Sequence, residues 1–461
     1  MEDNKRKIMN YTITNLIGKY PLSKKGNINI VNKGGTTGIL VLTRYHLFIF
    51  KGGNIMNLYE DLLWRGLIKD VAGEDIKDKL NGEPITFYWG TDPTADSLHI
   101  GHYSSLVTAK RLMKAGHHPI LLCGGATGRI GDPRPTAERE ILDYEVIENN
   151  IKGIRTQIDK LFEGKAQLVD NYDWTKNYTF LEFLRDIGKY INVNYMINKD
   201  IISRRLETGI TYAEFSYMLL QGYDFLHLYE TKNCIMQVEG SDQWGNITTG
   251  IELIKKKLGK EAYAFTMPLI LDGTGKKFGK SEGNALWLDK NKTTPYEIYQ
   301  YLINADDSKV FEYLKVFTFL SKEEIENIMK EQNERPETRV AQKALAYEVV
   351  KDIHSKEDAD KAVAISEALF TGNIKSLTEK EIEVAFHGVP TITINEETKL
   401  IDLLINGNIA SSRREAREFL NNNAITLDGD IINDENHIID LNKTYHIIRR
   451  GKKKYYLIKT K

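Results

Sequence analysis

Two histidines at the start of a helical stretch are the residues of this chain best suited to chemistry. His99 and His102 stand three positions apart with Gly101 between them, so both imidazoles fall on one face of the helix expected from Leu98 onward. A helix N-terminus carries free N–H groups and partial positive charge, and imidazoles beside it add donors where negative charge grows in phosphoryl or nucleotidyl transfer. The alternative is a capped helix with one surface and one core histidine. The glycine, which lets a ligand approach the backbone, favours the phosphate site.

The segments around the histidines predict a parallel sheet with a binding site at one edge. Residues 85–89 form a short apolar and aromatic run that ends at Gly90, and residues 119–123 form a second apolar run before the glycine-rich segment 124–133. Strand, helix, strand and glycine-rich loop describe half of a doubly wound parallel sheet, which binds ligands at the carboxyl ends of its strands. We therefore expect the histidines and the glycine-rich segment to share one site.

A polar stripe on an otherwise apolar helix predicts a pocket. Within residues 215–225, Tyr217, Gln221 and Asp224 fall at positions i, i+4 and i+7, which places them on one face. The stripe could instead be a solvated face. However, the opposite face, with Met218, Leu219 and Phe225, needs burial of its own, so a helix covered on both sides is the favoured interpretation.

Two further segments are expected to end strands of the same sheet. Residues 235–246 read as a short strand that runs into a glycine-flanked polar turn and a helix. Residues 269–271 read as an apolar strand, followed by a lysine-bearing loop that reaches Ser281. Lysines on a loop are usually solvated surface residues. This loop is a candidate part of the site only because it follows a predicted strand of the same sheet.

These segments carry a resemblance to a known family. Residues 99–102 (His-Ile-Gly-His) resemble the first signature of class I aminoacyl-tRNA synthetases, and residues 277–281 (Lys-Phe-Gly-Lys-Ser) resemble the second. The surrounding residues, from about Met56 to the C-terminus, resemble bacterial-type tyrosyl-tRNA synthetases. Two signatures in this order and at a domain-sized separation are far more specific than either one alone.

The resemblance implies a two-step reaction. The carboxylate of L-tyrosine attacks the α-phosphate of the substrate ATP, pyrophosphate leaves, and the tyrosyl group passes to the 3′ end of tRNA(Tyr). No covalent enzyme nucleophile is needed, because positioning and charge stabilisation suffice. The resemblance also implies Mg²⁺ that enters with ATP, no dedicated protein metal site, and a homodimer formed through a helical insertion in the catalytic domain.

The resemblance assigns roles to individual residues. The expected catalytic residues are Thr94, His99 and His102 at the phosphates, and Lys277 and Lys280 on a loop that closes over the leaving pyrophosphate. The expected tyrosine-binding residues are Tyr88, Asp132, Tyr217, Gln221, Asp224 and Gln243. The expected ATP-binding residues are Gly90, Asp92, Gly101, Ser105, Gly240, Asp242 and Lys280.

Amino-acid specificity is expected to come from Tyr88 and Asp224, which match the family's contacts to the substrate phenol hydroxyl. A buried phenol and a buried carboxyl that phenylalanine left unpaired would suffer a large desolvation penalty. Asp132, Tyr217 and Gln221 match the residues that bind the α-ammonium group, and Gln243 matches the one that binds the carboxylate.

Several positions depart from the family pattern. Trp89 stands where a small residue is common near the ribose, and Thr91 replaces a frequent aromatic residue. Glu239 stands where a second glycine is usual beside Gly240. The segment 134–136 (Arg-Pro-Thr) shortens a loop that often carries lysine. These departures bear on the contacts to ATP and tRNA and leave the expected reaction unchanged.

Composition excludes several classes of protein. The formal net charge of −1 excludes a uniformly basic nucleic-acid coat, so RNA contacts must come from local patches. Cys123 and Cys234 are the only cysteines, too few for a disulfide framework or a thiolate zinc site. No apolar run is long enough to span a bilayer. The cytoplasm is the expected location.

The expected fold class is α/β: a Rossmann-like doubly wound parallel sheet with a helical insertion, followed by an α-helical bundle and a small αβ RNA-binding module. The expected domains are a basic N-terminal extension (1–55), the catalytic domain with its helical insertion (56–275), a mobile lysine loop and linker (276–294), a helical tRNA-binding domain (295–372), a linker (373–396) and the small αβ module (397–461).

The two ends of the chain are both basic. Residues 38–50 could form a β-hairpin or a basic RNA-binding arm. However, relatives begin near Met56, so we favour the hypothesis that residues 1–55 are leader sequence that is not translated. The last module resembles an RNA-binding module shared with a ribosomal small-subunit protein, and Arg413, Arg414 and Arg417 are its expected tRNA contacts.

Three other classes of protein fit part of this pattern. A tRNA-independent nucleotidyltransferase would need neither the helical bundle nor the basic module. A tryptophanyl-tRNA synthetase would not be expected to pair Tyr88 with Asp224. An RNA-binding scaffold would have no reason to keep both histidines together with the lysine loop.

Overall fold

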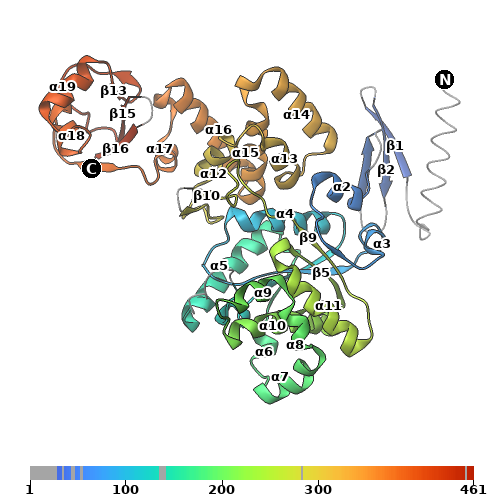
Figure 1. Ribbon diagram of the computed structural model, residues 1–461. Coiled ribbons are helices and arrows are strands. Elements are labelled where there is room, and N and C mark those ends of the chain that lie inside the picture. The colour runs from blue at the N-terminus through green and yellow to red at the C-terminus, as the bar shows by residue number, and fades with distance from the viewer. Residues whose placement is uncertain are drawn as a thin grey trace.

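The chain folds into three parts that follow one another along the sequence (Figure 1). The computed structural model describes residues 28–33, 36–42, 47–51, 56–133, 142–281, 284–451 and 454–460. A catalytic α/β domain is followed by a helical domain, and a small C-terminal module lies beyond the helical domain, away from the catalytic sheet (Figure 1). This confirms the predicted fold class.

The catalytic domain is built on a six-stranded sheet with the order β4-β9-β8-β5-β6-β7. Its strands are β4 (Val71–Ala72), β5 (Thr86–Thr91), β6 (His118–Cys123), β7 (Gln167–Asp170), β8 (Cys234–Gly240) and β9 (Tyr263–Met267). All pairings are parallel except that of the short edge strand β4 with β9. The chain runs from β5 outward to β6 and β7, and then returns to the other side of β5 with β8. The sheet order therefore reverses at β5, where a parallel sheet binds its ligands.

Alternate residues of β5 face two separate cores. Phe87 and Trp89 pack with α4 (Ile100–Lys114) and α5 (Tyr144–Leu161) on one face of the sheet. Tyr88 packs on the other face with α10 (Tyr212–Lys232) and α11 (Trp244–Leu258). Since successive side chains of a strand point to opposite faces, this alternation fixes which residues of β5 can reach a pocket beside α10.

A helical insertion connects β7 to α10. It comprises α6 (Tyr172–Thr175), α7 (Phe180–Asp186), η2 (Gly188–Tyr190), α8 (Val193–Ile197) and α9 (Asp200–Leu206), and it lies at the end of the catalytic domain far from the helical domain (Figure 1). Thr179 and Thr211 cap α7 and α10 through capping boxes with Glu182 and Glu214, so the local sequence sets where these two helices begin.

The helical domain shares its core with the catalytic domain. It consists of α12 (Pro295–Ile303), α13 (Val310–Phe317), α14 (Lys322–Glu334), α15 (Val340–Ile353) and α16 (Lys356–Thr371). Its apolar side chains are continuous with those of α4 in one buried cluster. At the boundary Asp352 of α15 accepts hydrogen bonds from Tyr103 and Lys110 of α4.

The C-terminal module is a five-stranded sheet with the order β12-β16-β15-β13-β14. Its strands are β12 (Thr391–Ile394), β13 (Ile425–Leu427), β14 (Asp430–Ile431), β15 (Tyr445–Arg450) and β16 (Lys454–Thr460), and α17 (Glu379–Ala385), α18 (Leu400–Asn406) and α19 (Arg413–Asn421) accompany them.

The structure differs from the sequence-based expectations in two segments. Residues 269–271, expected to be a strand, contribute only an isolated bridge between Leu271 and Lys277, and the strand of this region is β9. The segment 373–396, expected to be a linker, contains α17 and β12. Strand β12 pairs in parallel with β16, about sixty residues further along the chain, and no local pattern reveals such a distant partner.

Within residues 1–55 the structure describes three strands, β1 (Ile28–Lys33), β2 (Thr36–Leu42) and β3 (Leu47–Lys51), that form an antiparallel sheet. The pairing of β2 with β3 has the hairpin topology that was one expectation for this segment. The rest of the segment lies outside the described residues, and the hypothesis that it is leader sequence stays a prediction.

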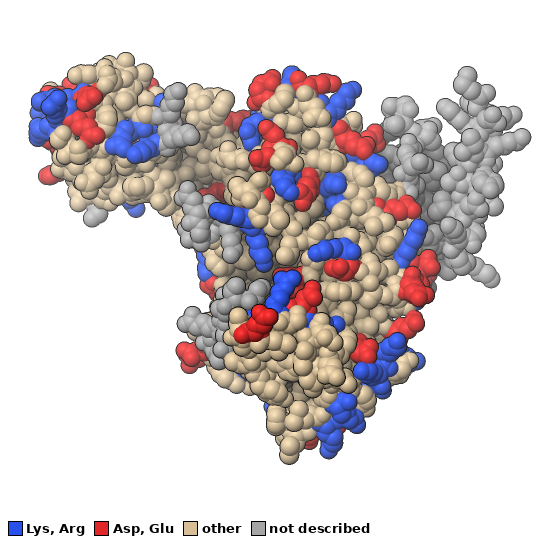
Figure 2. All heavy atoms as spheres, in the orientation of Figure 1, with Lys and Arg blue, Asp and Glu red and all other residues tan. Residues whose placement is uncertain are grey.

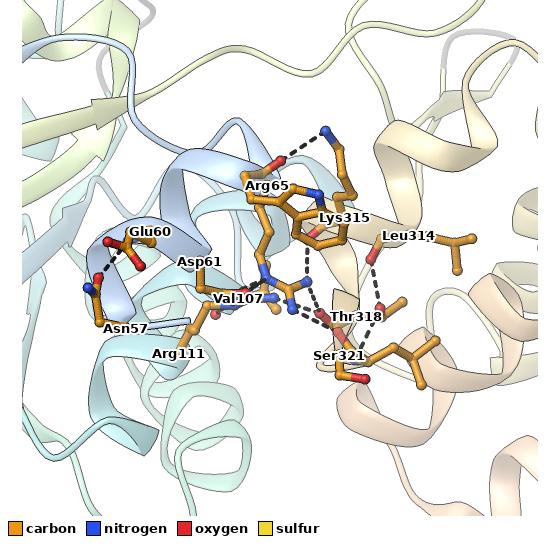
Figure 3. Close-up of polar contacts among 12 residues, drawn as sticks. Asn57, Glu60, Asp61, Arg65, Val107, Arg111, Leu314, Lys315, Thr318 and Ser321 are labelled. Carbon is orange, nitrogen blue, oxygen red and sulfur yellow. Dashed lines mark hydrogen bonds and ion pairs between the residues drawn. The ribbon is translucent and has the colours of Figure 1, made fainter. Parts of the chain in front are cut away.

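Two buried arginines of the catalytic domain hold the end of α13 (Figure 3). Arg65, the last residue of α2 (Leu58–Arg65), donates to the carbonyls of Lys315, Thr318 and Leu320, at 2.8, 3.3 and 2.7 Å. Arg111 of α4 donates to the Thr318 carbonyl at 2.6 Å. These carbonyls lie at and beyond the C-terminus of α13, where a helix leaves them without partners and favours cations.

Asp61 completes this arginine joint between the two domains. Its carboxylate accepts from the Arg65 Nε at 2.8 Å and lies 3.5 Å from the Arg111 Nε. One carboxylate thus sits between two buried guanidinium groups, which reduces the repulsion between them. The joint fixes α13 against α2 and α4 (Figure 3).

Replacement of Arg65 by Leu should lower the free energy of unfolding by about 3 kcal/mol, because it leaves buried carbonyls without donors. Denaturant unfolding measures the change. Lys322→Ala is the control, since Lys322 is exposed and its ion pair with Glu326 is weak at 3.7 Å, so its effect should stay below about 0.5 kcal/mol. Equal effects of the two substitutions would contradict the role of the joint.

Candidate active site

The site lies at the carboxyl ends of β5, β6 and β8, where the two signature segments meet. His99 is the N-cap of α4, its backbone N–H donates to the His102 Nδ1 at 3.2 Å, and the two rings stack with their centroids 3.8 Å apart. Backbone bonds join this helix start to the lysine-loop segment: Ile100 N donates to the Leu286 carbonyl and Leu286 N to the Gly279 carbonyl. The two histidines and the second signature are therefore parts of one site.

Glycine is required where the two signatures touch. A Cβ on Gly279, whose φ is +87°, would lie 2.2 Å from the Ile100 Cγ2. A Cβ on Gly101 would lie 2.8 Å from the His99 ring. Both distances are far below van der Waals contact. A side chain at position 279 would push the lysine loop away from α4, and a side chain at position 101 would displace the His99 ring.

The lysine loop is anchored to the helical domain through Phe278. The ring of Phe278 lies 4.7 Å from that of Tyr313 and 4.8 Å from that of Phe317, both in α13. Phe317 in turn stacks on Tyr103 of α4 at 6.1 Å. Lys277, beside this anchor, is exposed, and the side chain of Lys280 lies outside the described part of the chain.

A cluster of buried polar atoms on and beside β5 lacks partners among the residues that the structure describes. These atoms are the Tyr88 hydroxyl, the Gln221 Oε1 and the Gln237 Nε2, and no described residue forms a hydrogen bond with them. Buried polar atoms in folded proteins are almost always paired. Three unpaired atoms around one strand end thus indicate a place that a polar ligand completes.

Asp224 is the buried carboxyl of this cluster. The polar stripe on α10 is covered by other parts of the protein, since Asp224 is 2% exposed and Tyr217 is 5% exposed, and that it lines a ligand pocket stays a prediction. Asp224 accepts from the Asn171 Nδ2 and from the Trp174 Nε1, each at 2.9 Å. Burial raises the pKa of Asp224 to about 7, although these two hydrogen bonds act in the opposite direction.

A chain of hydrogen bonds connects Asp224 to the turn after β5. Asn171 also donates to the Thr127 Oγ1 at 3.0 Å, and Thr127 donates to the Asp92 Oδ1 at 2.7 Å. The Tyr217 hydroxyl donates to the Asp92 Oδ2 at 2.9 Å. The buried carboxyl and the carboxylate at the strand end are therefore positioned by the same network.

Asp132 and Gln243 form a second polar group of the site. Asp132 accepts from the Gln243 Nε2 at 2.9 Å and from the Asn246 Nδ2 at 3.0 Å. Asn246 also donates to the Gln243 Oε1 at 3.0 Å. The glycine-rich segment and the start of α11, far apart in sequence, thus present a carboxylate and an amide together.

The remaining predicted residues are distributed around the strand ends. Gly90 and Gly240 are the penultimate residue of β5 and the last residue of β8, and Asp242 in η3 (Ser241–Gln243) is exposed. Thr94 is exposed in the turn after β5. The Ser105 Oγ accepts from the Trp89 Nε1 at 3.0 Å and donates to the His102 carbonyl, so protein groups already engage this hydroxyl.

The three arginines predicted to bind tRNA do not belong to this site. Arg413, Arg414 and Arg417 lie on α19 of the C-terminal module, where Arg413 pairs with Asp402 and Arg417 with Glu435. Figure 2 shows lysine and arginine side chains gathered at the end of the module that carries this helix.

Sequence reasoning missed the residues that hold Asp224. Asn171 and Trp174, in the segment directly after β7, received no role, and Thr127 and Gln237 received none either. The cluster of large polar side chains directly after β7 was the available signal, because such a strand end faces the ligand crevice of a parallel sheet.

Comparisons with known proteins agree with this geometry. The family model described as tRNA synthetases class I (W and Y) matches residues 80–371, and a model of the tyrosine–tRNA ligase C-terminal domain matches residues 381–458. The chain is 48% identical over 417 residues to a tyrosine–tRNA ligase of Bacillus velezensis, covering 87% of this chain and 99% of the relative. It is 48% identical over 416 residues to that of Staphylococcus carnosus, covering 88% and 99%.

A solved structure has the same fold. A C-terminally truncated mitochondrial tyrosyl-tRNA synthetase of Aspergillus nidulans matches with a TM-score of 0.62 and 35% identity, covering 69% of this chain and 95% of that chain. The chain therefore belongs to the class I tRNA synthetases of the tryptophan and tyrosine group. Within that group it belongs to the tyrosine–tRNA ligases.

The raised pKa of Asp224 makes the stability of the protein depend on pH. The unfolded carboxyl loses its proton near 3.8 and the folded one near 7, so the native state holds one more proton between these values and the free energy of unfolding falls as pH rises. Asp224→Asn removes this dependence. The unfolding free energy of the variant relative to wild type should therefore rise by roughly 3–4 kcal/mol between about pH 4 and pH 7.

Denaturant unfolding across this pH range measures the difference. Asp173→Asn is the control, because Asp173 lies in the same short helix as Trp174 but is exposed, and its difference from wild type should stay flat. A flat difference for Asp224→Asn as well would show that Asp224 titrates like an exposed carboxyl.

Proposed function

We propose that this chain activates L-tyrosine with ATP to form tyrosyl-adenylate and pyrophosphate, and then transfers the tyrosyl group to the 3′ end of tRNA(Tyr). Membership of the tyrosine–tRNA ligases supports the overall reaction. The observation that carries the amino-acid specificity is the unpaired, buried Tyr88 hydroxyl next to the buried Asp224. The two are close enough for the charge of Asp224 to raise the pKa of Tyr88, in addition to the larger effect of burial.

The substrate phenol completes this part of the pocket. Its hydroxyl donates to Asp224 and accepts from Tyr88, which satisfies both buried groups at once. Phenylalanine fills the same volume but leaves the Tyr88 hydroxyl without a partner and gives Asp224 no donor beyond Asn171 and Trp174, and this difference discriminates the two amino acids. Asn171 and Trp174 keep the Asp224 carboxyl oriented toward the substrate.

The amino-acid backbone of the substrate binds where the other polar groups converge. Asp132 and the oxygen of Gln221, which has no partner among the described residues, accept from the α-ammonium group, and Tyr217 assists from its position on Asp92. Gln243 donates to the carboxylate. The hydrogen bonds that Asp132 receives from Gln243 and Asn246 hold it in place before the substrate arrives.

The adenylation step uses charge stabilisation. The substrate carboxylate attacks the α-phosphate of ATP, and the bond from the α-phosphorus to the bridging oxygen of pyrophosphate breaks. Thr94, His99 and His102 stabilise the negative charge at the α-phosphate, and Lys277 and Lys280 hold the leaving pyrophosphate. Gly90, Gly101, Gly240 and Asp242 bind the nucleotide, with the Asp242 carboxylate on the ribose hydroxyls. Mg²⁺ enters with ATP and neutralises phosphate charge.

The second step brings tRNA to the site. The helical domain and the C-terminal module bind tRNA(Tyr), and Arg413, Arg414 and Arg417 contact its phosphates. We place the reaction in the cytoplasm, where tRNA is aminoacylated, in keeping with two cysteines that are buried as free thiols. Among the described residues, no helix is long and apolar enough to cross a membrane.

Amino-acid-dependent ATP–pyrophosphate exchange without tRNA tests this function. Tyrosine alone of the twenty amino acids should support exchange. Asp224→Ala should lower kcat/KM for tyrosine by about 10- to 150-fold, the effect of losing a buried hydrogen bond to a charged group, while the KM for ATP changes less than threefold.

Each other result of that assay points to a different account. Exchange with tryptophan would identify the other specificity of this group, and exchange with no amino acid would favour an RNA-binding scaffold. Unchanged tyrosine kinetics in Asp224→Ala would refute the pocket. Asp173→Ala, an exposed carboxylate two residues from Asn171, is the matched control and should behave as wild type.

The helical insertion supports a proposal of homodimerisation. Large apolar side chains are exposed on it and at the start of α10: Phe180, Leu181, Val193, Leu206 and Tyr212 have between 49% and 76% of their surface exposed. Concentrated exposure of apolar residues marks interaction surfaces. A two-fold dimer that buries this insertion against its copy would cover them.

Leu181→Glu should convert the dimer to a monomer, because it places a charge in the interface, and analytical ultracentrifugation measures the mass. Val146→Glu is the control, since Val146 is 43% exposed on α5, outside the insertion, and its mass should match wild type. A monomeric wild-type protein, or a dimeric Leu181→Glu variant, would contradict the proposed interface.

A further inference from the structure

Strands β5 and β8 separate at their carboxyl ends. Their pairing ends at Tyr88 and Gln237, after a register irregularity. Beyond that point β5 stays paired with β6 as far as Thr91, and β8 stays paired with β9 as far as Gly240. The end of β5 therefore has no backbone partner on the side of β8, at the place where the sheet order reverses.

Glu239 fills this gap with its side chain. The Gly90 N–H donates to the Glu239 Oε1 at 2.5 Å, so a carboxyl oxygen takes the place of a backbone carbonyl of β8. Glu239 is 5% exposed. A glycine at position 239 would have no side chain and could not make this bond.

The charges around Glu239 matter because the crevice receives a triphosphate. Burial raises the pKa of Glu239 well above its ordinary value; the hydrogen bond from Gly90 opposes this, and Asp242 and Asp92 reinforce it. The titratable groups that face Glu239 are the Asp242 carboxylate in η3, the Asp92 carboxylate in the turn after β5, and the Tyr88 hydroxyl on β5. A raised pKa favours the uncharged form of this carboxyl, and that form bonds the strand with less negative charge beside ATP.

We propose that Glu239 is a positioning residue of the nucleotide crevice, which holds the Gly90 backbone at the end of β5 in the position that the adenosine of ATP requires. This inference rests on the proposed function, in which Gly90, Gly240 and Asp242 bind the nucleotide. The proposal gives Glu239, which lies outside both signatures, a role in binding ATP and no role in binding tyrosine.

Pyrophosphate exchange with three variants tests the proposal. Glu239→Ala should raise the KM for ATP about tenfold, because it leaves the Gly90 N–H unpaired, while the KM for tyrosine changes less than twofold. Glu239→Gln keeps an oxygen acceptor for Gly90 and should restore the KM for ATP to within about twofold of wild type. Glu230→Ala is the control, an exposed carboxylate at the end of α10.

A pH profile distinguishes positioning from a general loss of structure. The KM of wild type for ATP should rise with increasing pH as Glu239 ionises, and that of Glu239→Gln should not. The proposal would be overturned if the pH profiles of wild type and Glu239→Gln were parallel. It would also be overturned if Glu239→Ala changed the KM for ATP and the KM for tyrosine equally, or left the KM for ATP unchanged. Should Glu239→Ala fail to fold, the profiles of wild type and Glu239→Gln decide. Absence of tyrosine-dependent exchange in wild type would refute the proposed function instead.

Discussion

The burial of one carboxyl group, that of Asp224, constrains the architecture of the site. A buried carboxyl must be hydrogen-bonded, and Asp224 receives its donors from Asn171 and Trp174 in the segment after β7. The same network continues through Thr127 to Asp92. Elements from four parts of the chain are thereby fixed relative to β5. In our account the hydroxyl of the substrate phenol donates a further hydrogen bond to Asp224. The Tyr88 hydroxyl, on β5, donates to the oxygen of that phenol.

A second constraint joins the catalytic chemistry to the helical domain. The lysine loop touches α4 at glycines and is anchored by Phe278 among aromatic rings of α13. Helix α13 is itself held by Arg65 and Arg111 through the carbonyls at its end. The position of the loop relative to the two histidines therefore depends on the packing between domains. This gives the helical domain a part in forming the active site, in addition to the part in tRNA binding that we propose for it.

Local pattern predicted much of this site, because its residues follow strands at regular places. The two histidines at the start of α4, the polar stripe on α10 and the parallel sheet that carries them were expected from spacing and periodicity, whereas the order of the strands around β5 comes from the structure. What local pattern missed depends on distant partners. Strand β12 forms because β16 pairs with it, and the role of Asn171 exists because α10 brings Asp224 to it. Trp89 stands at a position expected near the ribose, and its side chain is buried on the α4 face and donates to Ser105, since the alternation of β5 assigns it there.

The central claim is that Tyr88 and Asp224 recognise the substrate phenol. The most direct measurement is the ratio of kcat/KM for tyrosine to that for phenylalanine in adenylate formation, in wild type and in Asp224→Ala. Sites that hydrogen-bond a substrate hydroxyl, with tyrosyl-tRNA synthetase as the established example, reach ratios of about 10⁵. The account predicts a large ratio in wild type that falls by at least about tenfold in the variant. A ratio that is equal in the two proteins would contradict it.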